Sequence, residues 1–64
     1  MILKIYSNQS NSIIFEKNIT NEILNEYNIN EKSEDFTELF ETELLSDIFE
    51  NYNINSSEVY YELS

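Results

Sequence analysis

The longest helical pattern in the chain covers residues 33–53 and constrains the fold more than any other segment. Phe36, Leu39 and Phe40 recur at the spacing of one helix face. Ser33 has a side-chain oxygen that can accept a hydrogen bond from a free N–H of the first turn. Acidic residues follow it, where negative charge favours the positive end of the helix dipole. The sequence therefore predicts a helix that begins at Ser33.

The apolar residues of this segment do not form a single stripe. At about 100° per residue, the first three lie nearly opposite to the apolar residues of the second half. That second set is Leu45, Ile48, Phe49 and Tyr52. One straight amphipathic helix on one core cannot bury both sets.

Two arrangements would resolve this conflict. In the first, the helix breaks near residues 41–43 and Thr42 caps a second helix. In the second, the helix is continuous and presents Leu45, Ile48 and Phe49 to a second copy of the chain or to another partner. The break is favoured, because small domains rarely leave such an apolar patch exposed.

The chain opens with two short segments that favour β-structure, residues 1–6 and 12–17, joined by a polar turn at 7–11. We expect a hairpin in which Ile5 pairs with Phe15 on the buried face. That register places Lys4 opposite Glu16, an opposite-charge pair that supports it. It also places Tyr6 opposite Ile14.

Two segments resemble each other, ILNEYNIN at 23–30 and IFENYNIN at 48–55, with five of eight positions identical. The first belongs to a short predicted helix at 21–27 that Thr20 caps. The chain has no glycine, so asparagine is the best remaining residue for a left-handed helix end. We expect Asn28 and Asn53 to end their helices in this way. Ile29 then packs on Leu24, and Ile54 packs on Phe49.

Residues 58–63 alternate cleanly, with Val59, Tyr61 and Leu63 on one side and Tyr60 on the other. This strand is expected to join the hairpin, because an isolated two-stranded hairpin is marginally stable. The prediction is a single α+β domain over residues 1–64. It is a β-β-α-α-β two-layer domain, with a small three-stranded antiparallel sheet and helices on one face.

The composition argues against catalysis. The chain contains no His, Cys or Arg, so an enzyme would depend on carboxylates, tyrosines and three lysines, and we expect none. Oxygen-bearing side chains do gather at Asn28, Asn30, Glu31, Ser33, Glu34 and Asp35. They lack the first Asp and the central Gly of a calcium-binding EF-hand loop, so we interpret them as a polar linker. No metal and no cofactor are predicted.

Thirteen acidic residues against three lysines give the chain a net charge of −10. Nucleic acids and anionic membranes would repel it. No apolar run approaches the roughly 18 residues of a membrane span, and the N-terminus lacks the apolar region of a signal peptide. We therefore expect a cytoplasmic protein with a basic protein as its partner.

The acidic residues of 33–53 are the candidate partner-binding residues, because no lysine lies among them. Carboxylates along a helix can occupy a basic groove that otherwise binds phosphates. The alternative is that they only keep the protein soluble. Tyr60 is added because exposed tyrosines are common at interfaces. The candidates are Glu34, Asp35, Glu38, Glu41, Glu43, Asp47, Glu50 and Tyr60.

In its size, its β-β-α-α-β pattern, its lack of cysteine and acids such as Glu34, Asp35, Glu38, Glu41 and Asp47, the chain resembles small acidic inhibitor proteins of phages and mobile elements. These include anti-CRISPR proteins that mimic DNA and inhibitors of uracil-DNA glycosylase. The resemblance implies an inhibitor that occupies the nucleic-acid-binding surface of a bacterial defence or DNA-processing effector, such as a CRISPR effector. The alternative is a homodimeric, antitoxin-like regulatory module that associates through its second apolar stripe.

Overall fold

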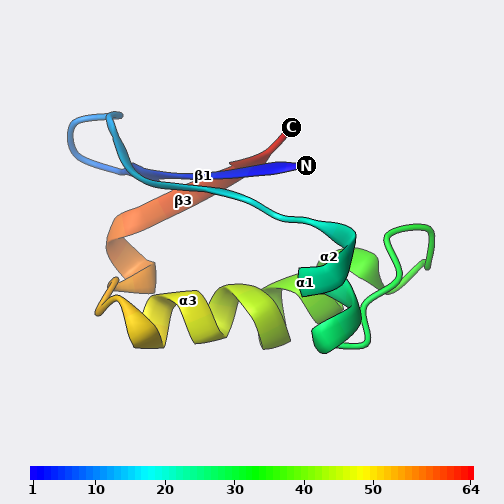
Figure 1. Cartoon of the computed structure of the whole chain (residues 1–64). Coiled ribbons are helices and arrows are strands. Elements are labelled where there is room, and N and C mark those ends of the chain that lie inside the picture. The colour runs from blue at the N-terminus through cyan, green and yellow to red at the C-terminus, as the bar shows by residue number, and fades with distance from the viewer.

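A computed structural model describes all 64 residues and shows two layers, a sheet and a set of helices that covers one of its faces (Figure 1). The predicted α+β class and strand arrangement are confirmed. In chain order the elements are β1 (Ile2–Ser7), β2 (Ile13–Asn18), α1 (Asn21–Glu26), α2 (Phe36–Leu39), the π-helix η1 (Phe40–Leu45), α3 (Ser46–Asn51), the 3₁₀ helix η2 (Ser56–Glu58) and β3 (Val59–Leu63).

The sheet has the strand order β2-β1-β3 and is antiparallel throughout. The predicted pairs Ile5 with Phe15 and Lys4 with Glu16 are confirmed. The prediction that Tyr6 lies opposite Ile14 is wrong, because Tyr6 pairs with Ile13. The register shifts after Ile5, so the hairpin contains a β-bulge that leaves one residue of β2 without a direct partner.

The last strand alternates as predicted. Val59, Tyr61 and Leu63 are half-buried on the side of the helices, while Tyr60 and Glu62 are exposed. Because β3 pairs with β1, the central strand lies between two neighbours, and its residues Leu3 and Ile5 are fully buried.

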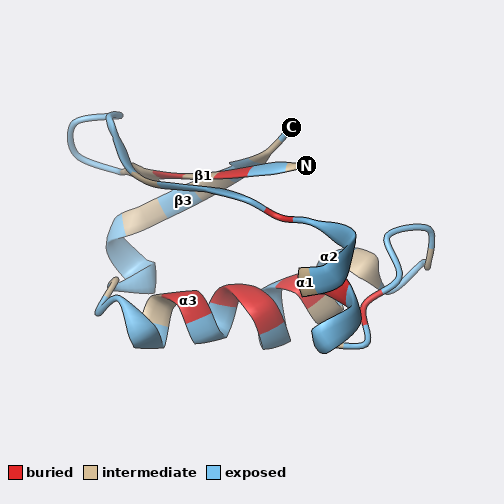
Figure 2. Ribbon diagram, in the orientation of Figure 1, coloured by how far each residue is buried: buried red, intermediate tan, exposed pale blue.

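The core between the two layers is entirely apolar. No polar or charged residue is buried, and the buried side chains come from the sheet, the helices and the segments that join them (Figure 2). They are Leu3, Ile5, Ile19, Leu24, Ile29, Phe40, Leu44, Leu45 and Ile48.

The two helix ends confirm the role predicted for asparagine. Asn28 and Asn53 have φ angles of 56° and 54°. After each of them the chain turns back, and the N–H of Ile29 donates to the Leu24 carbonyl at 2.9 Å while that of Ile54 donates to the Phe49 carbonyl at 2.8 Å. These are the hydrogen bonds of a Schellman motif. At the other end of α1, the Thr20 hydroxyl oxygen accepts from the Ile23 N–H, as predicted.

The central helix begins later than predicted. It starts at Phe36, and Asp35 occupies the N-cap position without a capping side-chain bond. The Ser33 hydroxyl oxygen accepts from the N–H of Asp35 at 3.3 Å. This hydrogen bond lies within the turn before the helix, which starts three residues after Ser33. Ser33 therefore stabilises that turn and does not cap the helix.

The predicted break near Thr42 is wrong. Residues 36–51 follow one helical path, in which η1 lies between α2 and α3. The Thr42 hydroxyl donates to the Glu38 carbonyl at 2.9 Å, a bond within the helix that no N-cap would make. The segment between the two apolar sets is a π-helix.

The π-helix explains why two opposite faces can share one core. In an α-helix, residues three, four, seven and eight positions after Phe40 would share its face. Here Leu44, Leu45, Ile48 and Phe49 follow Phe40 by four, five, eight and nine positions. A π-turn holds one residue more than an α-turn and moves the following side chains back by about 100°. The π-helix η1 therefore contains the one residue by which the spacing exceeds that of an α-helix. As a result, the apolar residues before and after η1 both face the sheet.

The same geometry corrects the predicted dimer surface. Leu45 is 4% exposed and Ile48 is 7% exposed, while Phe49 is half-buried against the same core. These side chains are used by the chain's own core, because the π-turn directs them toward the sheet. The stripe is therefore not available as a homodimer interface.

Candidate protein-binding surface

All seven predicted carboxylates of the helical layer are exposed. Glu34 and Asp35 lie in the turn before α2, and the other five are on the helix itself: Glu38, Glu41, Glu43, Asp47 and Glu50. The helix covers residues 36–51, about 24 Å at about 1.5 Å per residue. We call the seven residues the acidic helix surface.

Two tyrosine hydroxyls fix two of these carboxylates. The Tyr61 hydroxyl, from β3, donates to Glu41 Oε2 at 2.6 Å. The Tyr27 hydroxyl, from the end of α1, donates to Asp47 Oδ2 at 2.8 Å. The helix is thus connected through its carboxylates to the sheet and to α1. Each bond joins residues 20 positions apart, so no local pattern in the sequence indicates it.

These hydrogen bonds change how the tyrosines titrate. Burial, the hydrogen bond to Glu41 and the charge of Glu41 together raise the pKa of Tyr61 from its ordinary value of 10.0 to about 12. The pKa of Tyr27 is also raised, first by its hydrogen bond to Asp47 and then by burial and by the negative charges of Asp47 and Glu26. Both phenols favour the neutral form that donates to a carboxylate.

A titration of the tyrosines tests the contact between β3 and the helix. Tyr61 should ionise near pH 12, and Glu41→Gln should lower its pKa toward the ordinary value without reaching it, because burial remains. Since the folded pKa of Tyr61 exceeds the unfolded one, its contribution to stability is complete below about pH 10 and is lost as the pH rises toward 12. Phenolate absorbance and thermal unfolding measured across this range check both expectations. Glu43→Gln, which removes a charge from the same helix, should leave the Tyr61 titration unchanged.

The charge of the protein is concentrated in the helical half of the chain. Residues 20–53 contain ten acidic residues and one lysine, a net charge of −9. The remaining residues, which form the sheet and its turns, contain three acidic residues and two lysines, a net charge of −1. One side of the molecule is therefore strongly negative and the other is nearly neutral.

Tyr60 lies away from the acidic helix surface. Its ring stacks on Tyr6 with the centroids 5.0 Å apart, and its hydroxyl donates to Asn11 Oδ1 at 3.0 Å. Tyr60 is 43% exposed, and the alternation of β3 places it on the face away from the helices. Figure 1 shows that no helix covers this face of the sheet. The structure thus places all seven carboxylates in the helical layer and Tyr60 on the opposite side of the sheet.

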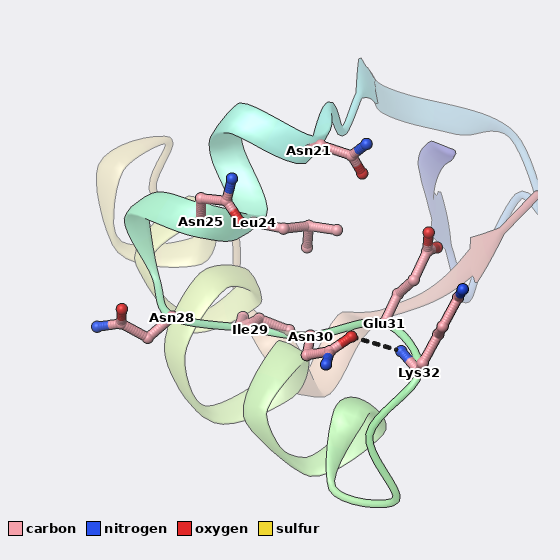
Figure 3. Close-up of a pocket in the computed structure, with 8 residues that line it drawn as sticks. All are labelled: Asn21, Leu24, Asn25, Asn28, Ile29, Asn30, Glu31 and Lys32. Atoms are coloured by element: carbon pink, nitrogen blue, oxygen red, sulfur yellow. Dashed lines mark hydrogen bonds between the residues drawn. The ribbon is translucent and has the colours of Figure 1, made fainter.

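The larger of two surface pockets lies at the end of α1 and in the loop after it (Figure 3). It has a volume of about 380 Å³ and contains no predicted site residue. Its lining is Asn21, Leu24, Asn25, Asn28, Ile29, Asn30, Glu31 and Lys32. Two of these residues, Leu24 and Ile29, belong to the core. The Oδ1 atom of Asn30 is already used, because it accepts a hydrogen bond from the backbone N–H of Lys32 at 3.0 Å. The pocket is therefore a hollow in the linker, with no group arranged for chemistry.

The second pocket, of about 290 Å³, lies between the first hairpin and the segment that joins α3 to β3. It also holds no constellation of titratable groups, since Glu58 is its one charged lining residue. Across the molecule, no group of three or more His, Cys, Asp or Glu side chains is arranged to hold a metal ion.

No family model, curated protein or solved structure matches this chain. No helix in the structure combines the length and the apolar composition that a membrane crossing requires. The features of the molecule that indicate a function are the charge of the acidic helix surface, its exposure and the two hydrogen bonds that position its carboxylates.

Proposed function

We propose that the protein is a non-enzymatic inhibitor that mimics nucleic acid and occupies the basic nucleic-acid-binding surface of a bacterial defence or DNA-processing effector. The observation that carries the proposal is the concentration of nine of the ten net negative charges in residues 20–53. A partner groove lined by Lys and Arg attracts such a field and accelerates association with it. A partner of this kind works in the bacterial cytoplasm, where we place the protein.

The arrangement of the acidic residues supports recognition over solubility alone. No lysine occurs between residues 33 and 53, so the carboxylates of the helix lack the opposite-charge neighbours that commonly stabilise exposed helices. Like charges at helical spacing cost a few tenths of a kcal/mol each. Tyr61 and Tyr27 hold two of the carboxylates in fixed positions, which reduces the entropy lost on binding.

The test compares two variants with equal changes in net charge. The first is the triple variant Glu38→Gln, Glu43→Gln and Glu50→Gln, which avoids the two carboxylates bonded to tyrosines. The matched control is Glu16→Gln, Glu58→Gln and Glu62→Gln, which removes three charges from outside the helical half. Each protein is immobilised and exposed to the heparin-binding fraction of a bacterial lysate, which is enriched in basic nucleic-acid-binding proteins.

We expect the unmodified protein and the control to retain partners that duplex DNA displaces, and the helix variant to retain about ten-fold less. Affinity for the retained partner should fall about ten-fold or more when the NaCl concentration is raised from about 0.05 to 0.5 M, because salt screens the contacts. The partner should lose DNA binding in a gel-shift assay when the protein is added. Equal retention by the two variants, or affinity that does not respond to salt, would contradict the proposal.

A further inference from the structure

Strand β3 forms an open edge of the sheet, because β1 is its one neighbour. Ile2 and Ser64 exchange both backbone hydrogen bonds, at 2.7 and 3.0 Å. In an antiparallel ladder such pairs alternate, so the N–H and C=O groups of Val59, Tyr61 and Leu63 point away from β1. A row of unpaired backbone groups of this kind is a template for another strand.

The two edges of the sheet differ in how they are protected. The edge strand β2 contains the bulge, and it carries Lys17 opposite the buried Leu3, on the side of the helices. Bulges and inward-pointing lysines are devices that prevent strand addition. In contrast, β3 pairs with β1 in regular register over all five residues and contains neither lysine nor proline. Its inward residues Val59, Tyr61 and Leu63 are half-buried.

We propose that β3 pairs with β3 of a second copy of this chain, antiparallel about a two-fold axis at Tyr61, to give one six-stranded sheet. The strand sequence VYYEL is self-complementary in this register. Val59 lies opposite Leu63 of the second copy, and the two Tyr61 residues lie opposite each other. On the other face Tyr60 lies opposite Glu62 of the second copy. The backbone groups that point away from β1 belong to Val59, Tyr61 and Leu63. This register places these three residues opposite one another, so their N–H and C=O groups can form hydrogen bonds between the two copies.

Charge selects this register over its neighbours. Only registers that differ by two residues keep the same backbone groups paired. If the second strand slides by two residues in one direction, Glu62 lies opposite Glu62 of the second copy. A shift in the other direction places Glu58 opposite Glu62. Like charges directly opposite each other destabilise a strand pair, and the register centred on Tyr61 has none. The self-complementarity of VYYEL in this register is the reason for choosing a second copy of the chain as the partner of this edge.

The charge distribution allows two such acidic molecules to meet at this edge. The part of the chain that forms the sheet carries a net charge of −1, against −9 for the helical half. Glu41, the helical carboxylate held at this edge, accepts a hydrogen bond from Tyr61 of its own chain. The two copies still repel each other through their total charges, so added salt should strengthen the dimer. Binding to a basic partner should instead weaken with salt, and the two proposals can therefore fail separately.

Cysteine crosslinking tests the register directly, because the chain has no cysteine of its own. Residues 60 and 62 of opposite copies form a non-hydrogen-bonded pair with Cα atoms about 4.5 Å apart, within the range for a disulfide. Tyr60→Cys and Glu62→Cys are prepared as separate proteins, and both positions are exposed. A mixture of the two should crosslink at least ten-fold more than either alone, since like positions are about 7–8 Å apart on the diagonal. The control mixture is Ile14→Cys with Glu16→Cys, on the β2 edge.

Sedimentation equilibrium gives the second readout. The mass should rise from 7.7 kDa toward twice that value with protein concentration, and more so in high salt. Leu63→Lys places an inward lysine on β3, as β2 already has, and should weaken the dimer at least ten-fold while the circular dichroism spectrum is retained. A monomer at every concentration and salt level would overturn the proposal. Crosslinking of the mixture that does not exceed that of the single proteins or of the β2 control would also overturn it.

Discussion

Replacement of Phe40 with alanine is expected to leave most of the protein unfolded at room temperature. Phe40 is fully buried, and its ring lies 5.7 Å from that of Phe36 and 5.9 Å from that of Tyr61. It therefore joins the helix to β3 at the start of the π-turn. Truncation of a buried Phe to Ala costs about 3–5 kcal/mol. A domain of this size rarely has more than about 3–5 kcal/mol of stability in total.

The matched control is Tyr52→Ala at the end of the same helical segment. Tyr52 is 58% exposed, and the centroid of its ring lies 4.9 Å from that of Phe15. Loss of such an aromatic pair costs about 0.5–1.5 kcal/mol. Urea unfolding followed by circular dichroism should show a complete cooperative transition for Tyr52→Ala. For Phe40→Ala it should show either no transition or only the last part of one, because most molecules are already unfolded without urea. A loss of less than about 1 kcal/mol in the Phe40 variant would mean that the core is not centred on this ring.

Local patterns in the sequence were sufficient to predict the strands, the Thr20 cap and the C-terminal ends of two helices, but not the start of the central helix at Phe36. Alternation identified β3 and its inward residues, and the charge pair of Lys4 with Glu16 identified the hairpin register up to Ile5. The repeated YNIN segments predicted two left-handed asparagines, because in a chain without glycine few residues tolerate a positive φ. In each of these cases the signal and the structure involve neighbouring residues or one strand pair.

The features that could not be predicted depend on a departure from regular geometry or on distant contacts. The bulge after Ile5 adds one residue to a ladder, and the π-turn adds one residue to a helix; a fixed repeat of 180° or 100° cannot represent either. The bonds from Tyr61 to Glu41 and from Tyr27 to Asp47 require the tertiary arrangement. The position of Tyr60 also depends on the tertiary arrangement, because the sheet separates it from the seven carboxylates of the predicted partner-binding site.

Deletion of Thr42 is expected to convert the π-turn into regular α-helix without loss of the core. After the deletion, Leu44, Leu45, Ile48 and Phe49 follow Phe40 by three, four, seven and eight positions, which is the spacing of one α-helical face. Thr42 is exposed and contributes one bond to the Glu38 carbonyl. Since π-turns are rare and α-helix is the preferred form, the free energy of unfolding should stay within about 1 kcal/mol of the unmodified value or rise.

Insertion of one alanine after Thr42 is the opposite change at the same site. It moves Leu44, Leu45 and Ile48 a further step of about 100° from the face of Phe40, and the loss of several buried side chains should lower the free energy of unfolding by about 3 kcal/mol or more. If deletion and insertion destabilise the protein equally, then the π-turn is not the device that aligns the two apolar sets. The deletion variant also retains all seven carboxylates of the acidic helix surface. If it stays folded but loses its partner, the partner depends on the spacing that the π-turn gives these carboxylates; if it keeps the partner, the charge alone is sufficient.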